Sequence, residues 1–176
     1  MTGVAVRPAT AADVEAIVDL LESVVEEGRW LGTELPLDRR EHLERLAAEV
    51  AEPEGSTLLV AVSPTGEVVG HLRLSRRPYG VATLSMYVAA VWRRRGVGSA
   101  LVAAALAAAC ASGAHKVALQ AWPNNTAALS LYTKFGFVEE GRLRRHYRRR
   151  DGSLWDAVVM GLVLDERSPG GPPDFL

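Results

Sequence analysis

The sequence contains a single cysteine, Cys110, among 176 residues. A lone thiol cannot form an intramolecular disulfide, which excludes a disulfide-stapled secreted fold and favours a reducing, cytoplasmic setting. Cys110 stands in the alanine-rich stretch LVAAALAAACA, which is typical of a helix. We therefore expect Cys110 to be a small core residue rather than a nucleophile.

The sequence also has no long apolar run and no excess of charge of one sign. The apolar stretch from Leu101 is about a dozen residues long and mostly alanine, too short to span a bilayer, so we expect no membrane partner. The N-terminus lacks a basic region followed by an apolar run, so we expect no signal peptide. Twenty basic and twenty-one acidic side chains leave a net charge of −1, so nucleic acid is not an expected partner and any recognition of anions must be local.

The pattern of apolar and turn residues predicts one α+β domain over residues 1–166, followed by a flexible C-terminal tail over residues 167–176. The predicted order is strand, two helices, three strands, helix, strand, helix and two strands. Short connections between the three consecutive strands imply antiparallel pairing. The expected strands cover residues 4–7, 56–63, 68–76, 81–91 and 115–122 and a hairpin over 141–164, and the expected helices cover 8–27, 39–52, 97–114 and 123–135.

A segment rich in glycine and arginine, VWRRRGVGSALV over residues 91–102, joins a predicted strand to a predicted helix. Glycine lets a backbone approach a ligand closely, and a helix N-terminus presents unpaired N–H groups, so the segment indicates a phosphate site. It contains no lysine, which excludes a P-loop, and Leu101 stands where a dinucleotide fingerprint needs its third glycine. A solvated basic turn is the alternative interpretation.

Arg93, Gly96 and Gly98 match the pattern R/QxxGxG/A, and at this point the sequence resembles the GNAT superfamily of acetyl-CoA-dependent N-acetyltransferases. A second segment, NTAALSLYTKFGFVEEG over residues 125–141, is similar to the family motif NxxAxxLYxKxGFxxEG at every fixed position. The resemblance covers most of the chain. It implies a GNAT fold, in which helices flank both faces of a central mixed, mostly antiparallel sheet.

The last predicted hairpin resembles one branch of this superfamily. A turn at Asp151 and Gly152, followed by Asp156 and Met160 in the final strand, is similar to amino-acid and phosphinothricin-type N-acetyltransferases. The hairpin also carries the run RLRRHYRRRDG over residues 142–152, which combines charge with aromatic rings. Such a run is the feature that would favour nucleic acid or an acidic protein as a partner, and a solvated hairpin face explains it at least as well.

The resemblance implies acetyl-CoA as co-substrate and no metal. Free backbone groups of a splayed strand would bind pantetheine, and the loop after it would wrap the pyrophosphate, mostly through backbone N–H groups. Tyr132 corresponds to the family tyrosine that protonates the departing thiolate. The residues expected to bind the coenzyme are Tyr87, Val88, Arg93, Arg94, Arg95, Gly96, Val97, Gly98, Ser99, Asn125, Ala128 and Tyr132.

The base that would deprotonate the attacking amine is left open by the sequence. Many family members carry a glutamate on the strand before the pyrophosphate loop, but ATLSMYV has Ser85 and no carboxylate there. The candidates are Glu26 and Glu27 at the end of a helix, Glu34 in the following loop, and His71 on a strand, acting directly or through water. The side chains expected to contact the acceptor are Trp30, Glu34 and Trp122, with Tyr79 as a further aromatic candidate.

We expect direct attack of a primary amine on acetyl-CoA in a ternary complex, because the lone Cys110, on a helix packed away from the predicted site, gives no support for an acyl-enzyme. A small molecule such as an amino acid or related metabolite is the preferred acceptor. A protein N-terminus or ribosomal protein as acceptor, a non-catalytic acyl-CoA-binding sensor and a homodimer stay open.

Overall fold

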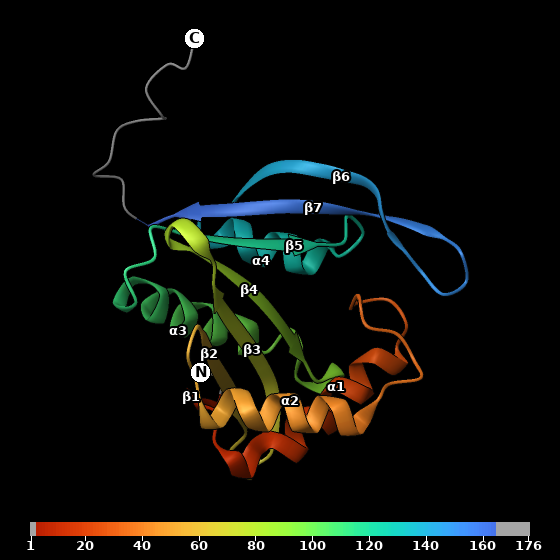
Figure 1. Cartoon of the computed structure of the whole chain (residues 1–176). Coiled ribbons are helices and arrows are strands. Elements are labelled where there is room, and N and C mark those ends of the chain that lie inside the picture. The colour runs from red at the N-terminus through yellow and green to blue at the C-terminus, as the bar shows by residue number, and fades with distance from the viewer. Residues whose placement is uncertain (1–2, 165–176) are drawn as a thin grey trace.

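The computed structural model describes residues 3–164, so the predicted tail over 167–176 lies outside the described residues. The described residues form one α+β domain in the predicted element order (Figure 1). Its strands are β1 (Ala5–Pro8), β2 (Ser56–Val62), β3 (Val68–Arg76), β4 (Val81–Val88), β5 (Lys116–Ala121), β6 (Val138–Arg148) and β7 (Leu154–Val163). Its α-helices are α1 (Val14–Glu26), α2 (Arg39–Ala51), α3 (Val97–Ala111) and α4 (Thr126–Lys134), and short 3-10 turns complete the chain.

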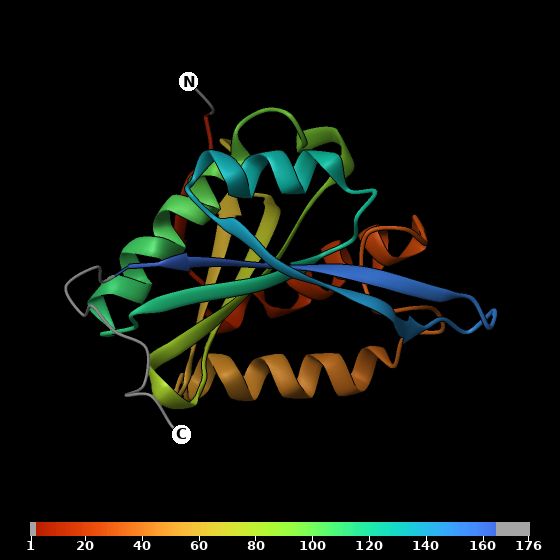
Figure 2. The same ribbon diagram turned by 90° about the horizontal axis from the view of Figure 1, so that it is seen from above.

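The strands form one seven-stranded sheet in the order β1-β2-β3-β4-β5-β7-β6. Only the β4–β5 pair is parallel among the described pairs, which confirms the predicted mixed, mostly antiparallel sheet. Helices α3 and α4 cover one face, and α1 and α2 cover the other (Figure 2). Side chains alternate between these faces along each strand. On β3, Leu72 and Leu74 therefore pack in the core cluster that includes α3, while His71 and Arg73 face the side of α1 and α2.

β4 and β5 diverge soon after they begin. Residues 81–83 of β4 pair with residues 116–118 of β5, and no pairing continues beyond them. The rest of β4 stays paired with β3 on its other edge, whereas β5 follows β7. One edge of β4, over residues 84–88, is thus left without a strand partner. Apart from Val88 O, which accepts a hydrogen bond from Arg93, the backbone groups of this edge are available to a ligand.

α3 packs its small side chains on the sheet and ends at Ala111, three residues before the predicted end. Its buried positions are Val97, Leu101, Val102, Ala105 and Ala109. The expectation that Cys110 lies in the core is wrong, because its side chain is exposed. Successive helix positions are rotated by about 100°, so the residue after buried Ala109 points outward. No helix within residues 3–164 has the length and apolar character needed to cross a membrane.

Candidate active site

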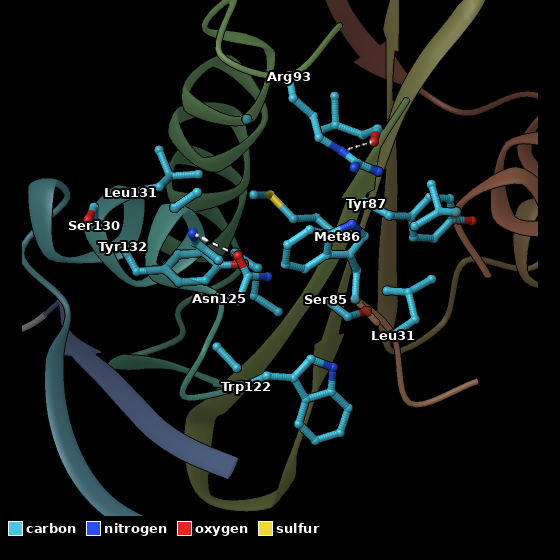
Figure 3. A pocket seen from close by; sticks show the side chains of 18 of the residues that line it. Leu31, Ser85, Met86, Tyr87, Arg93, Trp122, Asn125, Ser130, Leu131 and Tyr132 are labelled. Atoms are coloured by element: carbon cyan, nitrogen blue, oxygen red, sulfur yellow. Dashed lines mark hydrogen bonds between the residues drawn. The ribbon is translucent and has the colours of Figure 1, made fainter. Parts of the chain in front are cut away.

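A cavity of about 650 Å³ opens where β4 and β5 diverge (Figure 3). One side is the free edge of β4, and the opposite side is the end of β5 together with α4. Its lining includes Leu84, Ser85, Met86, Tyr87, Val88, Arg93, Arg94, Gly96, Gly98, Ser99, Gln120, Trp122, Asn125, Ala128, Leu131 and Tyr132. No aspartate or glutamate is among the described lining residues. Nor do residues 3–164 contain a group of three or more histidine, cysteine, aspartate or glutamate side chains able to hold a metal ion.

The glycine-rich loop enters α3 at the edge of this cavity. Gly96 is the N-cap of α3 with a φ of 82°, a left-handed conformation that favours glycine. A Cβ on Gly98 would lie 3.0 Å from Leu131 Cδ2 and 3.3 Å from Met86 Cε, so α3 approaches α4 and β4 more closely there than a side chain allows. The first N–H groups of α3 have no partner within the helix and face a site suited to an anion.

The backbone and side chains of the loop have different surroundings. Arg94, Gly98 and Ser99 line the cavity, whereas Val97 is buried in the core and the Arg95 guanidinium lies 5.4 Å from the Trp92 ring centre. Loop arginines are thus not all directed at one ligand. The predicted role of this segment depends on its backbone N–H groups, so it does not require all the arginine side chains to point at the ligand.

Arg93, the first residue of the motif, links three elements. Its Nε donates to Val88 O at 3.0 Å, its Nη1 donates to Glu27 Oε2 at 2.7 Å, and its Nη2 contacts Glu27 Oε1. Trp30 Nε1 donates to the same Glu27 carboxylate at 2.6 Å. Hydrogen bonds from Arg93 hold the pKa of Glu27 below its usual value. Glu27, a candidate base in the sequence, therefore lies in an ion pair that ties the end of α1 to the end of β4.

Tyr132 projects from α4 into the cavity (Figure 3). Asn125 begins the helix by accepting a hydrogen bond from Ala128 N at 3.2 Å, which fixes its first turn. The Tyr132 ring packs at 5.7 Å from Phe137, and the side chain is only 6% exposed. Burial raises the pKa of Tyr132 well above its usual value. Tyr132 therefore keeps its proton throughout the neutral pH range.

Aromatic rings line the end of the cavity nearest the β6–β7 hairpin. Trp122 is buried between Tyr147 and Trp155, with ring centres 5.1 Å and 5.3 Å away in edge-to-face contacts. Its indole Nε1 is buried without a hydrogen-bond partner among the described residues. Trp30 also lines the cavity. The structure thus brings Trp30 and Trp122 together in one cavity, as the acceptor hypothesis requires.

The tip of the β6–β7 hairpin holds the α1–α2 loop over the cavity. Arg149, which is 6% exposed, donates from Nη1 to Leu31 O at 3.1 Å and to Gly32 O at 2.9 Å. Glu34 accepts a hydrogen bond from Arg150 N at 3.1 Å and pairs with Arg149. Part of the arginine run therefore serves an intramolecular contact. Arg149 was not among the sequence candidates, since contacts across more than a hundred residues leave no local pattern.

The remaining candidates lie outside this first cavity. Glu26 is exposed at the end of α1, and Tyr79 is 94% exposed in the β3–β4 connection; neither lines a described cavity. His71 faces a second cavity of about 380 Å³ between the sheet and helices α1 and α2. The two cavities adjoin, because both are lined by Leu31, Gly32, Ser85, Met86 and Tyr87.

His71 is buried, and neither ring nitrogen has a hydrogen-bond partner within residues 3–164. Its ring lies 5.2 Å from that of Tyr87, and 5% of the residue is exposed. Burial, with a smaller contribution from the charge of Arg73, lowers the pKa of His71 to about 4. His71 is therefore neutral at pH 7 in the folded protein.

We expect the free energy of unfolding to fall by about 2 kcal/mol between pH 7 and pH 5 because of His71. The folded pKa is depressed from 6.5 to about 4, so the unfolded chain binds the proton first as the pH falls. His71 thus stabilises the fold above pH 6.5, and this contribution is lost as the pH approaches 4. Urea unfolding at both pH values measures it. His71→Gln is expected to reduce the change in unfolding free energy between pH 7 and pH 5, whereas His146→Gln, at an exposed position, is expected to leave that change as in wild type. A His71→Gln protein with the same change as wild type would contradict the assignment.

A divergent strand pair beside a glycine-rich helix N-terminus, with a protonated tyrosine across the cavity, is the arrangement expected from the resemblance to enzymes that use acetyl-CoA. The chain belongs to the acetyltransferase (GNAT) family, whose model matches residues 18–137. It is an acetyl-CoA-dependent N-acetyltransferase.

Two curated relatives and one solved structure illustrate the range of similar proteins. The chain is 38% identical over 109 residues to aminoglycoside N(6')-acetyltransferase type 1 of Klebsiella aerogenes, covering 57% of this chain and 70% of the relative. It is 27% identical to the L-methionine sulfoximine/L-methionine sulfone acetyltransferase of Pseudomonas aeruginosa, over 91% of this chain and 94% of that one. The crystal structure of ribosomal-protein-alanine N-acetyltransferase from Brucella melitensis matches with a TM-score of 0.81 and 27% identity, covering 91% of this chain and 99% of that one.

Proposed function

We propose that the enzyme transfers the acetyl group of acetyl-CoA to the amine of a small molecule, such as an amino acid or related metabolite, by direct attack in a ternary complex. The observation that carries this proposal is the contact by which Arg149 holds the α1–α2 loop against the cavity. Arg149 fixes the loop carbonyls of Leu31 and Gly32, and both of these residues line the two adjoining cavities. A small acceptor fits this arrangement, and the relative from Pseudomonas aeruginosa, which acts on amino-acid derivatives by its name, spans nearly the whole chain.

The coenzyme side uses backbone groups and one side chain. The free edge of β4 at Tyr87 and Val88 would pair with the amide groups of pantetheine as an added strand does. The N–H groups at the start of α3 would hold the pyrophosphate, with Ser99 as a further donor, and Gly98 permits the close approach of α3 to β4 and α4. Tyr132 would donate its proton to the departing thiolate.

The amine arrives neutral in this proposal. The described lining of the first cavity offers no carboxylate base, and a histidine with a pKa of about 4 is a poor proton acceptor at pH 7. About one peptide α-amino group in ten is neutral at pH 7, against about one lysine-type amine in a few thousand. The amine of a free amino acid lies between these limits, because its carboxylate raises the pKa of the ammonium group. Acceptors with an amine of lower pKa would therefore react faster at a given affinity, and the rate would rise with pH until the amine is deprotonated.

Acetyl-CoA turnover, measured as release of free thiol, tests the proposal against a panel of amino acids, polyamines, aminoglycosides and short peptides. Thiol release that depends on amino acids supports it. Release confined to peptides or to aminoglycosides would move the acceptor to those classes. Saturable acetyl-CoA binding without release on any amine would replace the proposal by a sensor.

A further inference from the structure

The second cavity is lined by polar groups that have no role in the proposed function. It lies on the face of the sheet covered by α1 and α2, behind Ser85 and Tyr87 of β4. A cavity that only completes the core is expected to be apolar. This one is instead lined by two arginines, two histidines and a glutamate, at positions Arg45, Arg73, His42, His71 and Glu49.

Several donors in this cavity have no partner among the described residues. Both nitrogens of His71 and the Nε of Arg73 are buried without a hydrogen bond. A neutral imidazole always carries one N–H, so His71 and Arg73 together present at least two unsatisfied donors. Leaving such groups buried and unpaired is unfavourable, which indicates a polar ligand at this place.

The fixed charges of the cavity favour an anion. Arg73 pairs with Glu49, with Nη2 at 3.0 Å from Oε1, so these two side chains balance each other. Arg45 has no carboxylate partner among the described residues, and its Nη2 lies 2.6 Å from His42 Nδ1. Two guanidiniums against one carboxylate leave the lining with one excess positive charge.

The cavity is also within reach of the reaction. Ser85 and Tyr87 have one side against the coenzyme cavity and line the second cavity as well. A ligand that places its amine near Ser85 in the first cavity would extend its remaining atoms toward Arg45 and Arg73. Five shared lining residues therefore place the second cavity directly beside the first.

We propose that the second cavity binds a carboxylate of the acceptor, through Arg45, the Nε of Arg73 and His71. The inference rests on the proposed function, because it assigns the other end of the same substrate. It names the substrate class as amines that carry a carboxylate a few bonds from the nitrogen. Cationic acceptors without an acidic group are disfavoured by the charge of Arg45.

Matched pairs of L-amino acids and their primary amides test the assignment, with kcat/KM measured for each. A carboxylate beside an ammonium group raises its pKa, so amides offer the larger neutral fraction at pH 7. A preference for the acids therefore arises from binding. We expect the wild type to prefer acids over amides by at least about 10-fold, the low end for one charge-assisted hydrogen bond.

Arg45→Met is expected to lower that preference at least about 10-fold, through KM rather than kcat. Both arginines of α2 are exposed, but Arg40 lines neither cavity and pairs with Glu44, so Arg40→Met is the matched control. Equal use of acids and amides by the wild type, or a preference that Arg45→Met leaves intact, would overturn the inference.

A binding titration separates this inference from the proposed function. L-amino acids are titrated into the protein saturated with coenzyme A, for wild type, Arg45→Met and Arg40→Met. Binding that is weakened only in Arg45→Met supports the carboxylate site even if no acetyl transfer is found, in which case the proposed function alone fails. Absence of binding by any L-amino acid would overturn the inference, even if other amines are acetylated.

Discussion

Replacing Gly98 by valine is expected to reduce kcat/KM for acetyl-CoA by at least about 100-fold, equivalent to about 2.7 kcal/mol. A Cβ at this position already lies 3.0 Å from Leu131 and 3.3 Å from Met86, whose side chains line the coenzyme cavity. Valine adds two methyl groups, so these side chains or the whole helix α3 must move. Overpacking of this kind also costs about 1–3 kcal/mol of stability.

Two further substitutions separate the loss of packing from a general effect of replacing glycine. Gly98→Ala is expected to have an intermediate effect, because the atoms nearest its Cβ are the mobile ends of two side chains. Gly141→Ala is the control, since a Cβ there meets nothing within 4 Å and the backbone has no positive φ. Acetyl-CoA titration and thermal unfolding measure both effects. A Gly98→Val protein that binds acetyl-CoA as tightly as wild type would contradict the proposed geometry.

The order of helices and strands was predictable because its determinants are local, whereas the mixed sheet was implied by the family resemblance. Apolar periodicity and turn residues indicate each element, and the predicted helices over 97–114 and 123–135 lie within three residues of the observed ones at each end. The glycine-rich loop also carries its own signal. The requirement for glycine at Gly98 has a further cause that the sequence does not reveal, because Leu131 lies on another helix and Met86 on a strand.

The acceptor side was less predictable because its contacts join distant segments. Arg149 reaches carbonyl groups of the α1–α2 loop, and Arg93 pairs with Glu27, more than sixty residues away. A run of arginines looks the same whether its guanidiniums are solvated or buried. Cys110 illustrates the same limit within one helix, because an alanine-rich helix gives little contrast between its buried and exposed faces.

Tyr132→Phe is expected to lower kcat by about 10- to 100-fold and to leave the KM for acetyl-CoA nearly unchanged. The substitution removes only the hydroxyl, so the ring keeps its contact with Phe137 and its place in the cavity lining. General acid catalysis contributes about 10²–10⁴-fold in typical cases. The lower range is expected here because a thiol with a pKa of about 8.5 leaves readily near neutral pH, even without a proton donor.

The pH profile gives this prediction a second readout. Burial raises the pKa of Tyr132 above its ordinary value, so Tyr132 keeps its proton as the pH rises. At any pH up to 10, we therefore expect no decrease in wild-type activity from loss of that proton. The advantage of wild type over Tyr132→Phe should therefore persist from pH 7 to pH 9 in the proposed acid role. A higher KM with unchanged kcat would instead make Tyr132 a binding group, and full activity in Tyr132→Phe would remove it from the reaction. Since leaving-group protonation and coenzyme binding move different kinetic constants, the two roles are distinguishable in one enzyme variant.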